Sequence, residues 1–343
     1  MRKEGKSAPW QKMLGDSVVS AEMLGQWFDI STEALAPVIR RYPMRINPYF
    51  LSLLRQSSDP IARQVIPDPR ELDENGFTQE DPFCETQRSP VPYLVHRYPD
   101  RVLFLVSGQC AVYCRYCMRK RNAGLKKTVG PLDVEPVEAY IRSTPAIREV
   151  ILSGGDPLLL QDDFLNDILS RLKSVSHVGR LRIHTRVPCV LPQRITISLV
   201  DILQRFAPLY INIQFNHPDE LTGEAANACA MLADAGIVLG SQTVLLKGVN
   251  DDPDTLAALM EKLLACRVRP YYLHHPDPVK GTAHFNVPVE KGLHIMENLR
   301  QRISGIGIPH YVRDHQGISG KMPVSAKPCV QNGNRAFDDC QGL

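Results

Sequence analysis

Three cysteines near residue 110 have the spacing of a metal-binding loop. Cys110, Cys114 and Cys117 follow the pattern C-x3-C-x2-C. Three thiolates on one short loop can bind three irons of a [4Fe–4S] cluster, whereas a ferredoxin supplies a fourth cysteine. A structural zinc ion is the alternative, but it usually has four ligands from two cysteine knuckles, and the sequence has no second knuckle. The pattern therefore favours a cluster with one iron open to a small ligand.

A glycine-rich turn follows the next predicted strand. Its residues are Ser153, Gly154, Gly155 and Asp156. Glycines at the end of a strand let the backbone approach a ligand closely, although such a turn can also be purely structural. Together with the cysteine loop and its aromatic Tyr116, the turn resembles the S-adenosylmethionine (SAM) site of the radical SAM superfamily. The resemblance implies a [4Fe–4S] cluster that binds SAM and cleaves it to a 5'-deoxyadenosyl radical.

These motifs lie in an alternation of predicted strands and helices that begins near residue 101. The predicted strands are Val102–Val106, Glu149–Leu152, Leu181–Thr185, Tyr210–Phe215, Val238–Leu245, Pro270–His274 and Pro309–Val312. The predicted helices are Pro136–Arg142, Phe164–Val175, Ile197–Phe206, Leu221–Ala235, Pro253–Ala265 and Glu290–Ile303. Such alternation indicates a parallel sheet. We expect an α/β fold, a partial (β/α) barrel of radical SAM type, with its chemistry at the carboxyl ends of the strands.

Composition excludes several other classes of protein. The formal net charge is only +3 over 343 residues, which is weak for a nucleic-acid binder. No run of 18 apolar residues and no signal segment is present, so we expect a cytoplasmic enzyme without a membrane span. Nine cysteines without a signal peptide argue against a disulfide scaffold.

From about His96 to Pro323 the sequence resembles the lysine 2,3-aminomutase family. The segments that carry the resemblance, besides the cysteine loop, are His96–Leu103, Arg119–Arg121, Ser153–Leu158, Leu191–Thr196, Phe215–Pro218, Pro270–Tyr272, Gly281 with His284 and Phe285, and Gly320–Pro323. We therefore expect three parts: a helical N-terminal extension (1–95), a radical SAM barrel that holds pyridoxal phosphate (PLP) (96–323) and a short tail (324–343).

The resemblance assigns roles to residues at matching positions. Lys321 is implied to hold PLP as a Schiff base, with Arg97 and Arg101 at its phosphate and Tyr98 at its ring. Arginine suits phosphate because its planar guanidinium donates two parallel hydrogen bonds and keeps its charge. A lone lysine is otherwise most often a solvated surface charge.

The resemblance also implies contacts to the substrate and to SAM. Asp277 and Asp314 match the aspartates that receive the ε-ammonium of lysine, and Arg119 matches the arginine that receives its carboxylate. Gln242 matches a glutamine that contacts SAM, whereas Gln214 stands where a histidine is expected. Long members of the family carry C-terminal cysteines that bind zinc between subunits. This sequence ends at Leu343, so the resemblance does not extend to a zinc-linked tetramer, and a homo-oligomer stays open.

The implied reaction is the conversion of L-lysine to β-lysine by radical migration of the amino group from C2 to C3. It needs an electron donor such as flavodoxin or ferredoxin. Two alternatives stay open: a 2,3-aminomutase acting on arginine or glutamate, and a non-catalytic iron–sulfur or zinc-binding module. Glutamate is disfavoured because its side chain would need a cation where Asp277 and Asp314 stand.

Overall fold

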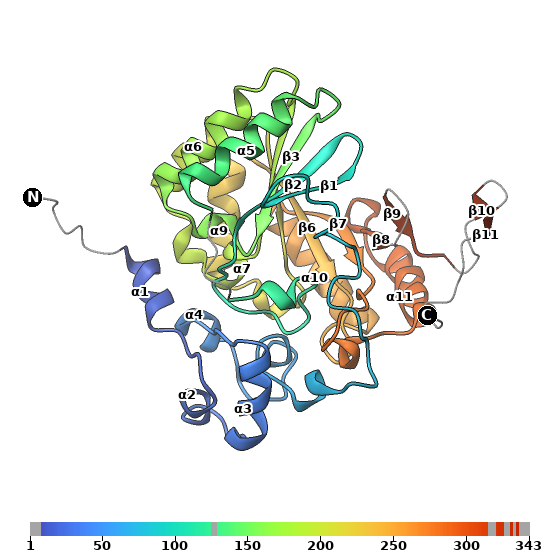
Figure 1. Cartoon of the computed structure of the whole chain (residues 1–343). Coiled ribbons are helices and arrows are strands. Elements are labelled where there is room, and N and C mark those ends of the chain that lie inside the picture. The colour runs from blue at the N-terminus through green and yellow to red at the C-terminus, as the bar shows by residue number, and fades with distance from the viewer. Residues whose placement is uncertain (1–7, 125–128, 315–319, 326–329, 332–333, 336–343) are drawn as a thin grey trace, which may run out of the picture.

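The computed structural model describes residues 8–124, 129–314, 320–325, 330–331 and 334–335. Its centre is a curled nine-stranded sheet whose strands follow chain order (Figure 1). The outermost strands are antiparallel to their neighbours, and those between run parallel. The strands of this sheet are β1 (Leu94–Tyr98), β2 (Arg101–Ser107), β3 (Glu149–Gly154), β4 (Arg180–Thr185), β5 (Leu209–Ile213), β6 (Val238–Val244), β7 (Arg269–His274), β8 (His310–Asp314) and β9 (Lys321–Pro323). A separate hairpin contains β10 (Val330–Gln331) and β11 (Asn334–Arg335).

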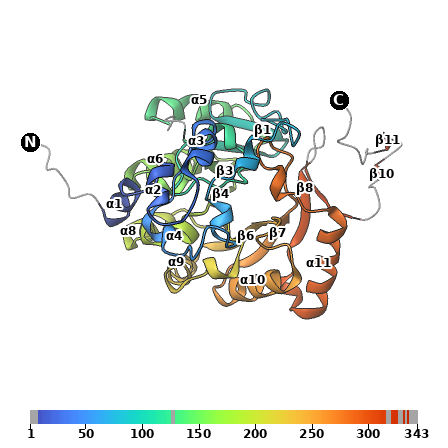
Figure 2. The ribbon, with the colours of Figure 1, turned by 90° about the horizontal axis from the view of Figure 1, so that it is seen from below.

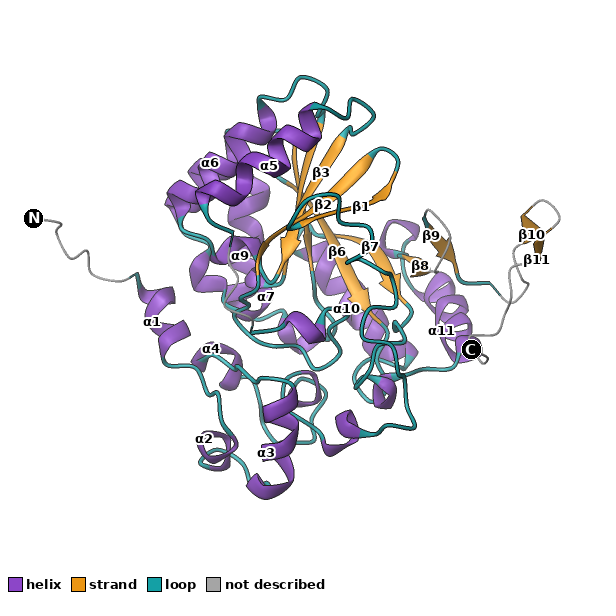
Figure 3. Cartoon of the chain, viewed as in Figure 1, coloured by secondary structure: helices purple, strands orange, loops and turns teal. Residues whose placement is uncertain are grey.

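Helices cover the outer face of the sheet (Figure 3). In α6, apolar side chains recur at i, i+3, i+4 and i+7, and this stripe is buried: Leu165, Ile168, Leu169 and Leu172. The helices are α1 (Pro9–Gly15), α2 (Ala21–Gly25), α3 (Thr32–Arg41), α4 (Pro48–Leu51), α5 (Pro131–Arg142), α6 (Asp162–Lys173), α7 (Val187–Val190), α8 (Ile197–Gln204), α9 (Gly223–Asp234), α10 (Pro253–Ala265) and α11 (Val289–Arg302). Among the described residues, none of these helices is long and apolar enough to cross a membrane.

The predicted partial barrel is confirmed: within the described residues the sheet is open, with β1 and β9 as its edges. Both edge strands were absent from the prediction. β1 pairs with β2 around the two-residue turn Pro99-Asp100, and such short edge strands carry too few residues for a clear alternation. The helix expected from Pro136 begins at Pro131 instead. Proline is favoured at the first helical position because a backbone N–H there would have no partner within the helix.

The N-terminal helices α1 to α4 lie beside the barrel, at the end where the cysteine loop follows β2 (Figures 1 and 2). Asn47 ties this segment to two loops, because its side-chain amide donates to the carbonyl oxygens of Ala111 and Val190. Residues from these helices and from the sheet share one hydrophobic core. The division into 1–95, 96–323 and 324–343 stays a proposal; β1 spans the first of these boundaries.

Alternation along the strands separates an apolar outer face from a polar inner face. In β4, Leu181 and Ile183 are buried beneath the helices, whereas Arg182 and His184 point the other way. His184 is in register with Asn212 on β5. The inside of the barrel is therefore lined with polar side chains, which suits a bound ligand better than a packed core.

Candidate active site

Side chains from both edge strands, β1 and β9, contact Asp314 at the end of β8. Because β9 is antiparallel to β8, Lys321 lies directly across from Asp314, and its Nζ is 2.5 Å from Asp314 Oδ2. Asp314 Oδ1 accepts a hydrogen bond from Arg97 Nη1 at 2.9 Å, although Arg97 is on β1 at the opposite edge. Gly320 has φ +146, a conformation that favours glycine, immediately before Lys321. The curl of the sheet thus brings two of the implied PLP residues to one carboxylate.

Tyr98 and Arg101 form the neighbouring wall. They are cross-strand partners on β1 and β2, and the guanidinium carbon of Arg101 is 3.9 Å from the centre of the Tyr98 ring. Arg101 also pairs with Asp100 at 2.7 Å and is partly exposed. The Tyr98 hydroxyl donates a long hydrogen bond of 3.4 Å to Asp314 Oδ1. An aromatic ring and two arginines therefore lie next to Lys321, a set that fits a planar phosphorylated ring.

Asp277 lies in the same charged interior, three residues beyond β7. Burial, and the neighbouring carboxylate of Asp314, raise the pKa of Asp277 to about 7 despite the opposing charges of Lys321, Arg97 and Arg119. These influences require the groups to be close in space. The structure therefore brings together the aspartates and the arginine that the resemblance assigned to the substrate.

Arg119 has a partner that the sequence did not predict. Its Nε and Nη2 donate to the two carboxylate oxygens of Glu85 at 2.9 and 2.6 Å. Within the part of the chain that the structure describes, Nη1 of Arg119 has no hydrogen-bond partner. Glu85 fixes the plane of the guanidinium and leaves that edge available to an anion.

The three loop cysteines are close enough to influence one another. Burial raises the pKa of Cys110 well above its usual range, and the charges of Asp156, Cys117 and Cys114 raise it further. Bound iron would offset the negative charge of the thiolates, because it takes the place of the thiol protons. No group of three His, Cys, Asp or Glu side chains among the described residues converges on one metal ion. A [4Fe–4S] cluster needs no such point, because each thiolate binds a different iron.

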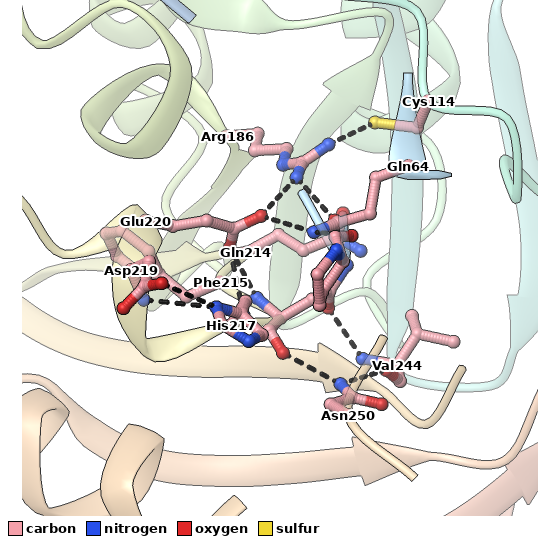
Figure 4. Close-up of polar contacts among 12 residues, drawn as sticks. Gln64, Cys114, Arg186, Gln214, Phe215, His217, Asp219, Glu220, Val244 and Asn250 are labelled. Carbon is pink, nitrogen blue, oxygen red and sulfur yellow. Dashed lines mark hydrogen bonds and ion pairs between the residues drawn. The ribbon is translucent and has the colours of Figure 1, made fainter. Parts of the chain in front are cut away.

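A buried arginine touches this loop (Figure 4). Arg186 follows β4, and its Nη1 donates to Cys114 Sγ at 2.7 Å. Its Nη2 donates to Glu220 Oε1 at 2.8 Å and to Gln64 Oε1 at 2.7 Å. The sequence analysis did not identify Arg186. The available signal was its position directly after β4, at the carboxyl end of a strand that lines the barrel.

Tyr116 anchors the other side of the cysteine loop. Its hydroxyl accepts hydrogen bonds from Asn216 Nδ2 at 2.7 Å and from Gln214 Nε2 at 3.1 Å. Gln214 thus reaches the cysteine loop from the end of β5, at the position where a histidine was expected.

The glycine-rich turn packs against the cysteine loop. A Cβ on Gly154 would lie 2.4 Å from Ser107 O, and one on Gly155 would lie 2.2 Å from Gln109 O. Only glycine fits at either position. The buried carboxylate of Asp156 accepts from Thr185 Oγ1 and from the Arg186 backbone N–H, each at 2.7 Å.

The turn therefore fixes the cysteine loop to β3 and β4. Burial raises the pKa of Asp156 to about 6. Ser153, at the end of β3, is buried. Contacts of these four residues with SAM stay predictions.

Two buried polar atoms on the inner face have no partner among the described residues: His184 Nε2 and Asn212 Nδ2. Gln242 lies nearby on β6, half-buried and in register with Tyr272. Buried polar groups are nearly always hydrogen-bonded in native proteins. These atoms therefore mark where a polar ligand fits. Sequence reasoning identified Gln242 and missed His184, although alternation along β4 places it on the inner face.

A buried triad supports the cysteine loop from beneath and leads to a stability prediction. Glu71 pairs with Arg115 at 2.5 Å and with Lys120 at 2.6 Å, and all three side chains are at most 3% exposed. Glu71→Gln would leave two buried cations without an anion, so we expect a loss of about 3–5 kcal/mol in unfolding free energy. Urea unfolding measures it.

The matched control is Glu80→Gln. Glu80 pairs with Arg41 at 2.6 Å, but both side chains are half exposed, so the loss should stay below about 1 kcal/mol. Equal losses of unfolding free energy in the two variants would show that the buried triad stabilises the protein no more than an exposed ion pair does.

Known proteins share this sequence pattern. Residues 104–260 match the model of the radical SAM superfamily. An L-lysine 2,3-aminomutase from Fusobacterium nucleatum is 44% identical over 321 residues, which cover 92% of this chain and 76% of that protein. The chain belongs to the lysine 2,3-aminomutase family. A glutamate 2,3-aminomutase from Clostridioides difficile is 41% identical over 88% of this chain and 72% of its own.

The lysine 2,3-aminomutase family consists of radical SAM isomerases that use a [4Fe–4S] cluster, SAM and PLP. Membership confirms the predicted enzyme class, whereas the residues that hold each cofactor stay predictions. Among solved structures, Streptococcus suis SuiB bound to SAM is similar over 64% of this chain and 51% of its own, with a TM-score of 0.48 and 14% identity.

Proposed function

We propose that this chain converts L-lysine to β-lysine by moving the amino group from C2 to C3. The observation that supports it best is that Asp314 already binds a primary ammonium, that of Lys321, at 2.5 Å. Asp277 lies close by as a second carboxylate. A lysine substrate would present the same chemical group to the same pair.

The negative charges of Asp277 and Asp314 oppose glutamate as substrate. Its side-chain carboxylate would be buried next to Asp277 and Asp314, and burying an unpaired charge is costly. Arginine remains the alternative, because a guanidinium can pair with the same carboxylates. The substrate's own carboxylate would bind Arg119, whose Nη1 edge faces away from Glu85.

Each cofactor has a set of residues that fits it. The cysteine loop would hold the cluster, with SAM at the open iron, beside Gln242 and the glycine-rich turn. Arg97 and Arg101 would bind the phosphate of PLP, Tyr98 would contact its ring, and Lys321 would attach to it. When bound, these groups supply the radical and the activated carbonyl, while the protein positions them.

Proton positions follow from the Lys321–Asp314 contact. Lys321 Nζ must lose a proton before it can act as a nucleophile, and Asp314 Oδ2 is the nearest described acceptor. A proton taken up by Asp314 must leave again before its carboxylate, which also binds Arg97, can pair with the ε-ammonium of the substrate. The side chains of Arg97 and Asp314 are each 10% exposed, and limited access of water protects a radical from side reactions.

A pH dependence follows from the pKa of about 7 at Asp277. Below that pH the carboxyl is neutral and cannot attract the ammonium of lysine. We expect kcat/KM to rise roughly tenfold per pH unit up to about 7 and then level off, since kcat/KM reports the free enzyme. Asp277→Asn should lack this rising limb; an unchanged limb in the variant would assign it to another group.

Borohydride trapping tests the PLP assignment. Reduction should fix PLP covalently to Lys321, as peptide mapping would show, and Lys321→Arg should remove the label. Lys280→Arg serves as the control and should keep it. A label on Lys280 in the native enzyme, or full labelling of Lys321→Arg, would refute the assignment.

A further inference from the structure

A pocket of about 190 Å³ opens on the surface beside the cysteine loop. We call it the cationic pocket because Arg63, Arg70 and Lys247 line it, together with Asp68 and Phe285. All three cations are exposed. No role assigned above uses them.

The pocket carries an excess of positive charge. Arg70 pairs with Asp68 at 2.6 Å, but within the described residues neither Arg63 nor Lys247 has an acidic partner. Arg63 lies beside Gly248, since a Cβ added to this glycine would be 3.2 Å from Arg63 Nη1. Gly248 directly follows Lys247, so the two cations without acidic partners are neighbours.

A second surface pocket near the loop differs in this respect. Its arginines, Arg41 and Arg121, pair with Glu80 at 2.6 Å and with Asp81 at 2.9 Å. Its Lys120 pairs with buried Glu71, so within the described residues Lys280 is the one cation of the four lining this pocket without an acidic partner, against two in the cationic pocket.

The cationic pocket connects directly to the cluster ligands. Phe285, which lines it, packs edge to face against Tyr116 with ring centres 6.1 Å apart. Tyr116 precedes the ligand Cys117. On the other wall, the residue after Arg63 is Gln64, whose carbonyl oxygen accepts from the Arg115 backbone N–H at 2.8 Å.

We propose that the cationic pocket is where an acidic one-electron carrier protein docks to reduce the cluster. The carrier, with a flavin or iron–sulfur centre, loses one electron, and the cluster gains it across the Phe285–Tyr116 contact. That electron then breaks one carbon–sulfur bond of SAM. Electron-transfer partners bind weakly through small interfaces, and complementary charge speeds their encounter. The inference rests on the proposed cluster, but not on the choice of substrate.

The test compares two reductants on the reconstituted enzyme by following cluster absorbance. One is reduced flavodoxin, an acidic protein; the other is photoreduced deazariboflavin, small and neutral. The variant is the double substitution Arg63→Glu with Lys247→Glu. The control is Lys173→Glu with Arg205→Glu, two exposed cations on α6 and after α8 that change the net charge equally.

At low salt we expect the pocket variant to be reduced by flavodoxin at least about tenfold more slowly than the native enzyme. Reduction by deazariboflavin should be unchanged, and the control should stay within about twofold with both reductants. Added salt should shrink the difference. Equal rates for pocket and control variants with flavodoxin would overturn the proposal, as would an equal loss with deazariboflavin. Absence of a cluster in the native enzyme would instead overturn the proposed function.

Discussion

Single replacement of Cys110, Cys114 or Cys117 by alanine is expected to abolish cleavage of SAM. Each thiolate would bind a different iron, so loss of one leaves two protein ligands on a cluster that already has an open iron. Iron, sulfide and visible absorbance after anaerobic reconstitution measure the cluster. Formation of 5'-deoxyadenosine measures the chemistry.

Cys266→Ala is the matched control, since Cys266 is half-buried after α10 and distant in sequence from the loop. It should retain native cluster content. Full cluster content in any of the three loop variants would contradict the assignment of that cysteine. Loss in the control as well would point to a general folding defect.

Alanine at Asp277 or Asp314 should give the second largest effect. Removing one partner of a buried ion pair costs about 3–5 kcal/mol, which corresponds to roughly 10²–10⁴ in kcat/KM for lysine. Cluster content should remain native in both variants. Because Asp314 also binds Arg97 and Lys321, only Asp277→Ala is expected to leave PLP content unchanged.

The control for this pair is Asp254→Ala, whose carboxylate pairs with Arg302 but is 84% exposed. It should turn over lysine at a near-native rate. Near-native turnover in both Asp277→Ala and Asp314→Ala would remove lysine as the substrate. The radical SAM chemistry would survive that result.

Local patterns predicted most of the barrel. The alternation of strands and helices and the cysteine spacing depend on residues close in sequence, so they can be read without a structure. The helix α10 was predicted with its observed bounds, Pro253–Ala265, because Asp252 caps it and an apolar stripe defines its buried face.

The contacts that assemble the site were not predictable in this way. The Arg97–Asp314 pair joins residues 217 positions apart and requires the sheet to curl. The pairs Glu85–Arg119 and Arg186–Cys114 likewise join separate segments. No local periodicity specifies such pairs, since they depend on which strands become neighbours. Prediction therefore named residues of the site but not the partners that hold them.

The product formed from lysine tests the proposed function most directly. Lysine labelled with ¹⁵N at the α-amino group is incubated without oxygen with the reconstituted enzyme, SAM, PLP and a reductant. Nuclear magnetic resonance should find the label on C3 of β-lysine, and omission of PLP should prevent it. Cleavage of SAM with no β-lysine, or faster conversion of arginine or glutamate than of lysine, would contradict the proposal.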